Sequence, residues 1–199
     1  MKTILGIKKG MTQVFNDKGN PVPVTLVLAG PIEVVQVKTK EKDGYESLQV
    51  GFGETKKASK PLAGHQKGKK FRFLREIAKP ETELATGAIL TVEQFTAGEK
   101  VSVAGISKGH GFAGGIKRHH FSRGPVSHGH PFSRKPGSIG SMNPERVMKG
   151  LRMAGRMGGK RVTVKNLKIF SVDLQKNLLL LEGAVPGCPN ALLEIRGRD

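Results

Sequence analysis

The chain has 199 residues, enough for one or two domains, and its 34 Lys and Arg residues against 16 Asp and Glu residues give a net charge of +18. This excess of positive charge makes nucleic acid, an anionic membrane surface or an acidic protein the candidate partners. Apolar runs of no more than four residues argue against a membrane span, and the single cysteine, Cys188, excludes an intrachain disulfide.

Short strands separated by turns are predicted for most of the chain. Alternating apolar side chains place them at residues 3–7, 11–15, 22–28, 32–38, 48–52, 100–106, 162–170 and 178–185. Turn sequences lie between several of these strands, at residues 17–20, 43–44 and 173–177. A capping box at Thr91-Val-Glu-Gln94 predicts a short helix closed by Gly98, and Asn143-Pro144 predicts another that ends near Gly150. The pattern favours a mainly β fold, a small barrel or sandwich.

Two segments carry nearly all of the net charge. Residues 56–79 hold nine Lys or Arg and one acid, and residues 107–161 hold twelve and one, so the segments contribute +8 and +11. The rest of the chain is almost neutral. We therefore expect a body formed by residues 1–55, 80–106 and 162–199, a basic inserted subdomain segment at 56–79, and an extended basic finger at 107–161.

The longer basic segment lacks the composition of a self-supporting core. Its 55 residues include 12 of the 27 glycines but only eight Leu, Ile, Val or Phe. Such a stretch buries too little apolar surface to offset the entropy lost on ordering. We expect it to be unstructured until a polyanion such as RNA neutralises it.

The glycines and histidines of this segment also allow other interpretations. Gly109-His-Gly-Phe-Ala-Gly114 matches a dinucleotide-binding pattern, but no acidic residue follows until Glu145, so we expect no such cofactor. A metal site would need supporting carboxylates or thiolates, which are absent around His119, His120, His128 and His130. We expect no metal and no catalytic nucleophile–base pair. These rings suit stacking on bases or bonding to phosphates.

Basic and aromatic side chains are therefore the candidate RNA-contacting groups, because Lys and Arg bind phosphates while flat rings stack on unpaired bases. In the shorter segment they are Lys56, Lys57, Lys67, Lys69, Lys70 and Arg72. In the longer one they are Lys108, Lys117, Arg118, His119, His120, Phe121, Arg123, His128, Arg134, Lys135, Arg146, Lys149, Arg152, Arg156, Lys160 and Arg161.

Taken in order, several motifs resemble the universal large-subunit ribosomal protein family conventionally called L-three, in its bacterial form. The first is Gly6-Ile-Lys-Lys-Gly-Met-Thr-Gln-Val-Phe15, and Ser107-Lys-Gly-His-Gly-Phe-Ala-Gly114 follows with Lys117-Arg118. Further matching stretches lie at residues 127–129, 136–140, 153–158, 161–164 and 177–187. The resemblance covers nearly the whole chain.

The resemblance implies a translation-factor-type β-barrel with a small inserted α+β region and a long loop that penetrates RNA. It implies direct binding of 23S-type rRNA near its 3′ end, a part in nucleating subunit assembly, and neighbours from the L-fourteen and L-nineteen families. It also implies that the loop extends toward the peptidyl transferase centre, with its nearest residues at Gly137, Ser138, Gly140, Ser141, Met142 and Asn143.

The chain departs from the family at two positions. Ser141-Met-Asn143 contains no glutamine, which some bacterial members methylate here, and His119 stands where some members have tryptophan. Without a signal or transit pattern at residues 1–6, we expect a cytoplasmic ribosomal protein with no membrane or small-molecule partner. A free RNA chaperone or architectural protein, and a histidine-based nuclease, are the alternatives.

Overall fold

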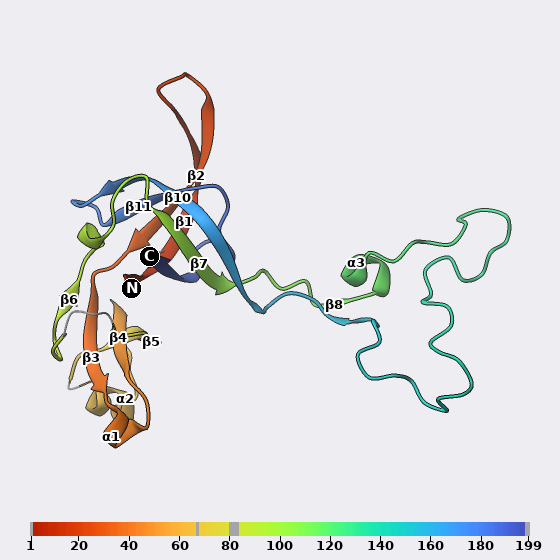
Figure 1. Cartoon of the computed structure of the whole chain (residues 1–199), viewed down its shortest axis with the longest axis horizontal. Coiled ribbons are helices and arrows are strands. Elements are labelled where there is room, and N and C mark those ends of the chain that lie inside the picture. The colour runs from red at the N-terminus through yellow and green to blue at the C-terminus, as the bar shows by residue number, and fades with distance from the viewer. Residues whose placement is uncertain (1, 67, 80–83, 198–199) are drawn as a thin grey trace. The chain divides into compact units, whose positions relative to one another are not determined.

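The computed structural model describes residues 2–66, 68–79 and 84–197. The chain forms two compact units: a body, Met1–Ser107 with Arg161–Asp199, and an insertion unit, Lys108–Lys160. Strands dominate over short helices (Figure 1), so the predicted mainly β fold is confirmed. No helix among the described residues is long and apolar enough to cross a membrane.

Six strands of the body form a ring-like sheet that closes on itself, called here the closed sheet. All pairings that were identified in it are antiparallel, and β2 pairs back with β1. In order around the ring the strands are β1 (Thr3–Phe15), β12 (Leu192–Gly197), β7 (Lys100–Ile106), β10 (Arg161–Asp173), β11 (Leu178–Glu182) and β2 (Pro21–Ala29). Apolar side chains from every strand, including Leu5, Val27, Val103, Leu179, Leu193 and Ile195, are completely buried.

A second sheet of the body has the order β5–β4–β3–β6. Its strands are β3 (Ile32–Lys38), β4 (Ser47–Glu54), β5 (Phe71–Ile77) and β6 (Ile89–Leu90). Short helices lie between them along the chain: α1 (Lys40–Asp43), α2 (Lys60–His65) and the 3-10 helix η1 (Val92–Gln94). Ile32, Val34, Leu48 and Val50 join the buried cluster that also contains the closed-sheet side chains, so the two sheets share one core.

A β-bulge explains why residues 3–15 form one strand where two were predicted. The register with β2 shifts between Lys8 and Gly10, which breaks the alternation of apolar side chains. The Lys8 side chain is buried there, and its ammonium donates to the carbonyl oxygens of Val185 and Gly187, 3.0 and 3.1 Å away. The bulge thus turns a cation inward and satisfies it with backbone.

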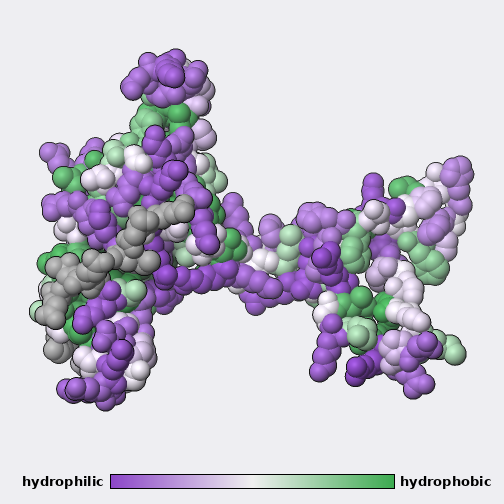
Figure 2. Space-filling model, viewed as in Figure 1, coloured by the Kyte–Doolittle hydropathy of each residue, from purple (hydrophilic) through white to green (hydrophobic). Residues whose placement is uncertain are grey.

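Regular structure in the described insertion unit consists of three short elements. Strands β8 (Phe112–Ala113) and β9 (Gly155–Arg156) pair with each other, and helix α3 (Gly115–His119) follows β8. Turns and extended segments make up residues 121–154. Figure 2 shows hydrophilic and hydrophobic residues interspersed over this unit.

The structure confirms most predicted strands and corrects both predicted helices. Residues 143–150 form turns, because their apolar side chains Val147 and Met148 are exposed and find no surface to pack against. The predicted helix after Thr91 is only the 3-10 turn η1, and the Thr91 side chain makes no capping hydrogen bond. Strands β5, β6 and β12 and helices α1, α2 and α3 were not predicted.

Candidate nucleic-acid interface

The insertion unit concentrates positive charge on exposed side chains. Residues 108–160 contain eleven Lys or Arg and one carboxylate, Glu145, so acidic partners within the unit can neutralise few of them. Arg118 is half-buried. The other predicted cations here are exposed: Lys108, Lys117, Arg123, Arg134, Lys135, Arg146, Lys149, Arg152, Arg156 and Lys160. An extended array of this kind can contact successive phosphates of a nucleic-acid backbone.

Helix α3 is fastened to the chain segment that leads into β9. Arg118 donates from Nη1 to the Met153 carbonyl oxygen at 2.6 Å, and His119 Nε2 lies 3.0 Å from the same oxygen. The rings of His119 and Phe121 are 5.8 Å apart, while His120 is exposed at the left-handed C-cap of the helix. These contacts engage Arg118 and His119 within the unit, and the His119 ring lies beside that of Phe121.

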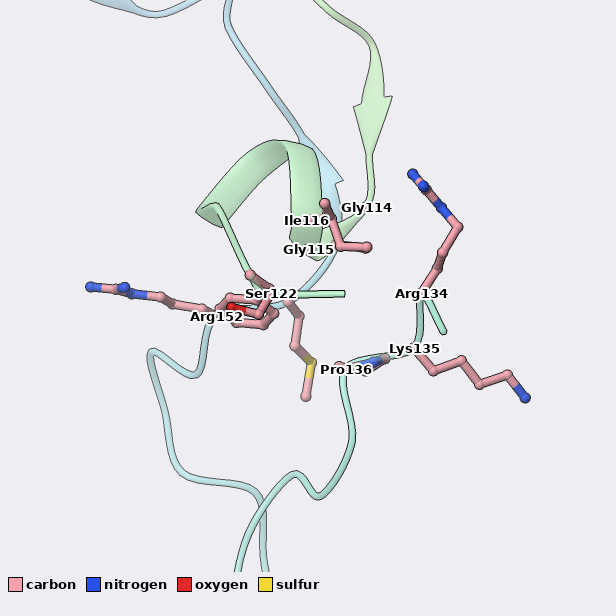
Figure 3. A pocket seen from close by; sticks show the side chains of 11 residues that line it. Gly114, Gly115, Ile116, Ser122, Arg134, Lys135, Pro136 and Arg152 are labelled. Carbon is pink, nitrogen blue, oxygen red and sulfur yellow. The ribbon is translucent and has the colours of Figure 1, made fainter. Parts of the chain in front are cut away.

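A pocket of about 700 Å³ opens beside this helix. Ile116, Phe121, Pro136 and Met153 supply an apolar lining. Figure 3 shows the side chains of Arg134, Lys135 and Arg152 at its edge, pointing away from one another. An apolar floor with diverging cations can accept a flat, uncharged ring while the cations remain accessible to attached anionic groups. Several of these residues were predicted to contact RNA, but their arrangement around one pocket was not predicted.

The segment predicted to lie nearest the catalytic RNA is exposed along its length. From Gly137 to Asn143 every residue is accessible, and Met142 retains 90% of its surface. Gly137 has φ +80°, which glycine adopts without strain, and Ser138 Oγ donates to the Gly140 carbonyl oxygen at 3.1 Å. Ser141 is likewise exposed. The exposed Met142 is an apolar side chain still without a packing surface.

Backbone hydrogen bonds hold the two ends of the insertion unit together. His110 N donates to the Met157 carbonyl oxygen and Met157 N donates to that of Gly111, both at 2.9 Å. Gly158 lies directly against the Lys108 carbonyl oxygen with φ +74°, so any side chain here would collide with backbone. These contacts define where the unit begins and ends.

The shorter basic segment forms part of the second sheet and its connections. Lys56, Lys57 and Lys70 are exposed, and the guanidinium of Arg72 lies 5.1 Å from the Phe73 ring centre. Lys69 forms an ion pair with Glu33, which engages one predicted RNA-contacting cation. The predicted contact Lys67 lies outside the described residues.

Arg161, the first residue of the body after the insertion, is held by a carboxylate. Its guanidinium forms a two-pronged contact with Glu194, with Nη1–Oε1 and Nη2–Oε2 distances of 2.9 and 2.5 Å. Hydrogen bonding to Glu194 raises the pKa of Arg161 above its ordinary value. Arg161 was predicted to contact RNA, whereas its acidic partner Glu194 was not predicted.

Histidine and acidic side chains in the described part of the chain do not form a metal site, since no three potential ligands lie close enough together. His128 and His130 are exposed, in a stretch of turns. His130 lines a second cavity of about 670 Å³ with Phe132 and Lys135, whose ammonium lies 4.5 Å from the Phe132 ring centre. The histidines thus accompany aromatic and cationic groups rather than carboxylates.

Comparison with known proteins gives consistent matches. The model of the family described as Ribosomal protein L3 matches residues 76–178. Proteins described as "Large ribosomal subunit protein uL3" from Heliobacterium modesticaldum and Desulfitobacterium hafniense are 53% and 51% identical, covering 98% of this chain and 96% and 95% of theirs. The protein of that description from Streptococcus pyogenes serotype M6 is 51% identical, over 98% of this chain and 96% of its own.

Proposed function

We propose that this chain binds 23S-type rRNA directly through its insertion unit. The premise is that the chain belongs to the ribosomal protein L3 family. Members of this family are structural proteins of the bacterial large ribosomal subunit and not enzymes. The proposal rests on the array of exposed cations between Lys108 and Lys160, a stretch that contains a single carboxylate. The insertion unit has little core of its own, and its positive charges repel one another. A polyanion that fills the space between its turns would stabilise it.

The pocket beside α3 supports RNA over other polyanions. Its apolar lining, with Phe121 among it, fits an unstacked base, and Arg134 and Arg152 at its edge fit the phosphates on either side of that base. A duplex keeps the faces of its bases stacked on one another, so it offers no ring to such a pocket. The proposal is therefore that the insertion unit grips irregular or single-stranded rRNA.

The finer parts of the proposal follow from family membership. The closed sheet is a translation-factor-type barrel with a small inserted α+β region that includes residues 56–79, and residues 107–161 form a loop that penetrates RNA. The protein binds near the 3′ end of the rRNA, helps nucleate subunit assembly, and lies beside members of the L-fourteen and L-nineteen families. Gly137–Asn143 extends toward the peptidyl transferase centre.

Binding of the full chain to a transcribed 23S-type rRNA fragment tests the proposal. Nanomolar to micromolar affinity that falls steeply with salt is expected, and an affinity independent of salt would contradict it. Co-sedimentation separates this function from that of a free RNA chaperone. A subunit component stays with the large subunit at high salt, whereas a free RNA chaperone is released at moderate salt.

A further inference from the structure

We propose that Glu194 gathers Arg75, Arg161 and Arg196 into a binding site for an RNA backbone phosphate on the body. This inference rests on the proposed RNA-binding function and adds a second contact region outside the insertion unit. Two of its three arginines, Arg75 and Arg196, are not among the RNA contacts expected from the sequence. Glu194, although acidic, promotes binding of an anion by holding the arginines in place.

The three arginines reach one carboxylate from three different strands. Arg161 on β10 contacts both oxygens of Glu194 on β12. Arg196, two residues farther along β12, has Nη2 3.6 Å from Oε2, and Arg75 on β5 has Nε 4.0 Å from Oε1. Since β5 belongs to the second sheet, the cluster joins residues from both sheets of the body.

Charge and exposure distinguish this cluster from an ordinary ion pair. The Glu194 side chain is only 10% exposed, whereas those of Arg75, Arg161 and Arg196 are 51%, 52% and 43% exposed. Three guanidinium charges against one carboxylate leave a local charge of +2. A further anion on the open side would relieve the repulsion that the single Glu194 carboxylate leaves among the arginines.

Hydrogen-bond capacity points to a phosphate. Each guanidinium has five N–H donors, and the two Glu194 oxygens cannot accept them all. Arg75 directs one Nη1 donor to the Leu74 carbonyl oxygen at 2.9 Å, which helps to fix its orientation. Several donors held in place on the exposed side match the oxygens of a phosphate, which arginine binds in a two-pronged manner.

RNA is favoured over an acidic protein as the source of that anion. Arg161 follows Lys160 directly in the chain, so the cationic array of the insertion unit continues into the cluster without a break in sequence. A backbone already bound by the insertion unit would offer successive phosphates. An isolated protein carboxylate would have no such continuity.

Glu194→Gln is expected to weaken RNA binding although it removes a negative charge. If RNA were attracted by net charge alone, removing a negative charge would strengthen binding. If Glu194 assembles the arginines, its loss lets the guanidinium groups separate and binding weakens, by about three- to tenfold, the range expected for losing one or two solvent-exposed charge contacts. The exposed Glu46→Gln is the matched control, because it removes the same charge away from the cluster and should bind equally well or slightly better.

The experiment measures affinity of the full chain for a transcribed 23S-type rRNA fragment over a series of salt concentrations. Arg75→Gln and Arg196→Gln are included because they alter half-exposed side chains and leave the buried acid in place, which keeps the test valid if Glu194→Gln fails to fold. Each should reduce the steepness of the salt dependence by about 0.7–0.9, the value for one phosphate contact.

Unchanged salt slopes for both arginine variants, or tighter binding by a folded Glu194→Gln, would overturn the proposal. Weaker capture of a polyglutamate peptide by those variants, with RNA binding intact, would assign the cluster to a protein carboxylate and also overturn it. If the unaltered protein fails to bind the fragment, the proposed function itself is wrong, an outcome distinct from loss of the Glu194 site alone.

Discussion

Neutralising exposed cations of the insertion unit should make RNA binding less sensitive to salt by a predictable amount. Lys117, Arg146 and Lys149 are exposed, and none of them lines the pocket beside α3. Each phosphate contact contributes about −0.7 to −0.9 to the slope of log K against log salt, so about ten contacts give a slope near −7 to −9. Replacing these three residues by glutamine should reduce its magnitude by about 2 to 2.7.

Filter binding or anisotropy on a transcribed 23S-type rRNA fragment, from low to moderate salt, measures this slope. The matched control replaces Lys18, Lys40 and Lys42, three exposed lysines of the body outside the predicted contacts, and removes the same total charge. Its slope should stay close to that of the unaltered protein. Equal reductions in the two triple variants would refute the reasoning, because binding would then respond to net charge and not to contacts of the insertion unit.

Three further predictions concern the pocket, the core and a titrating contact. Because the chain contains no tryptophan, Phe121→Trp introduces a single tryptophan into the pocket, and rRNA should quench its emission more strongly than that of Phe112→Trp, which lies outside the pocket. Leu193→Ala should lower the free energy of unfolding in urea by about 2–5 kcal/mol because Leu193 is fully buried, and a loss below about 1 kcal/mol would contradict this packing. Hydrogen bonds from Lys38, and to a smaller extent from Tyr45, lower the pKa of Glu76 from its usual 4.5. The ionised Glu76 therefore stabilises the folded protein above pH 4.5, and this stabilisation is lost as the pH falls through the lowered pKa. Glu76→Gln should therefore be less stable than the unaltered protein at neutral pH, with the difference disappearing in acid; a difference that persists there would contradict this.

Alternation of apolar residues predicted the strands because it reports directly which side of a strand is buried. The observed β3 and β7 have the predicted bounds, and β2, β4 and β10 differ from prediction by one to three residues at either end. These strands place Val34, Val50 and Val103 in the core. The local signal was sufficient to place these strands, although burial does not alternate throughout them: on β2, Val27 and Ala29 are buried while Leu26 and Leu28 are only partly buried.

Long-range contacts explain the elements that the sequence did not reveal. Strand β12 carries Glu194 between the buried Leu193 and Ile195. The cost of burying the Glu194 carboxylate is offset by Arg161, which lies 33 positions away in the sequence. Strand β5 is amphipathic only weakly, and it is fixed by its pairing with β4. Neither partner can be recognised from a window of neighbouring residues.

The same limitation applies to the candidate interface. Composition identified the basic segments and the side chains suited to RNA, because charge and ring chemistry are properties of single residues. It did not bring Phe121 together with Pro136 and Met153, since that arrangement depends on how turns return residues 134–136 and 152–154 to α3. The pocket is therefore a feature of the folded insertion unit and not of its composition.

Gly158 offers a test of whether the paired ends of the insertion unit matter for RNA binding. Alanine at this position would need an unfavourable φ of +74° and would push its Cβ into the Lys108 carbonyl oxygen. Gly109→Ala is the matched control, because a Cβ at Gly109 meets nothing within 4 Å. Gly158→Ala should weaken rRNA binding and remove hydrogen-exchange protection from the amides of His110 and Met157 in the complex, while the closed sheet stays protected. Unaltered protection of both amides would mean that the backbone can accommodate the methyl group, and that the crossing of the two chain segments does not depend on glycine.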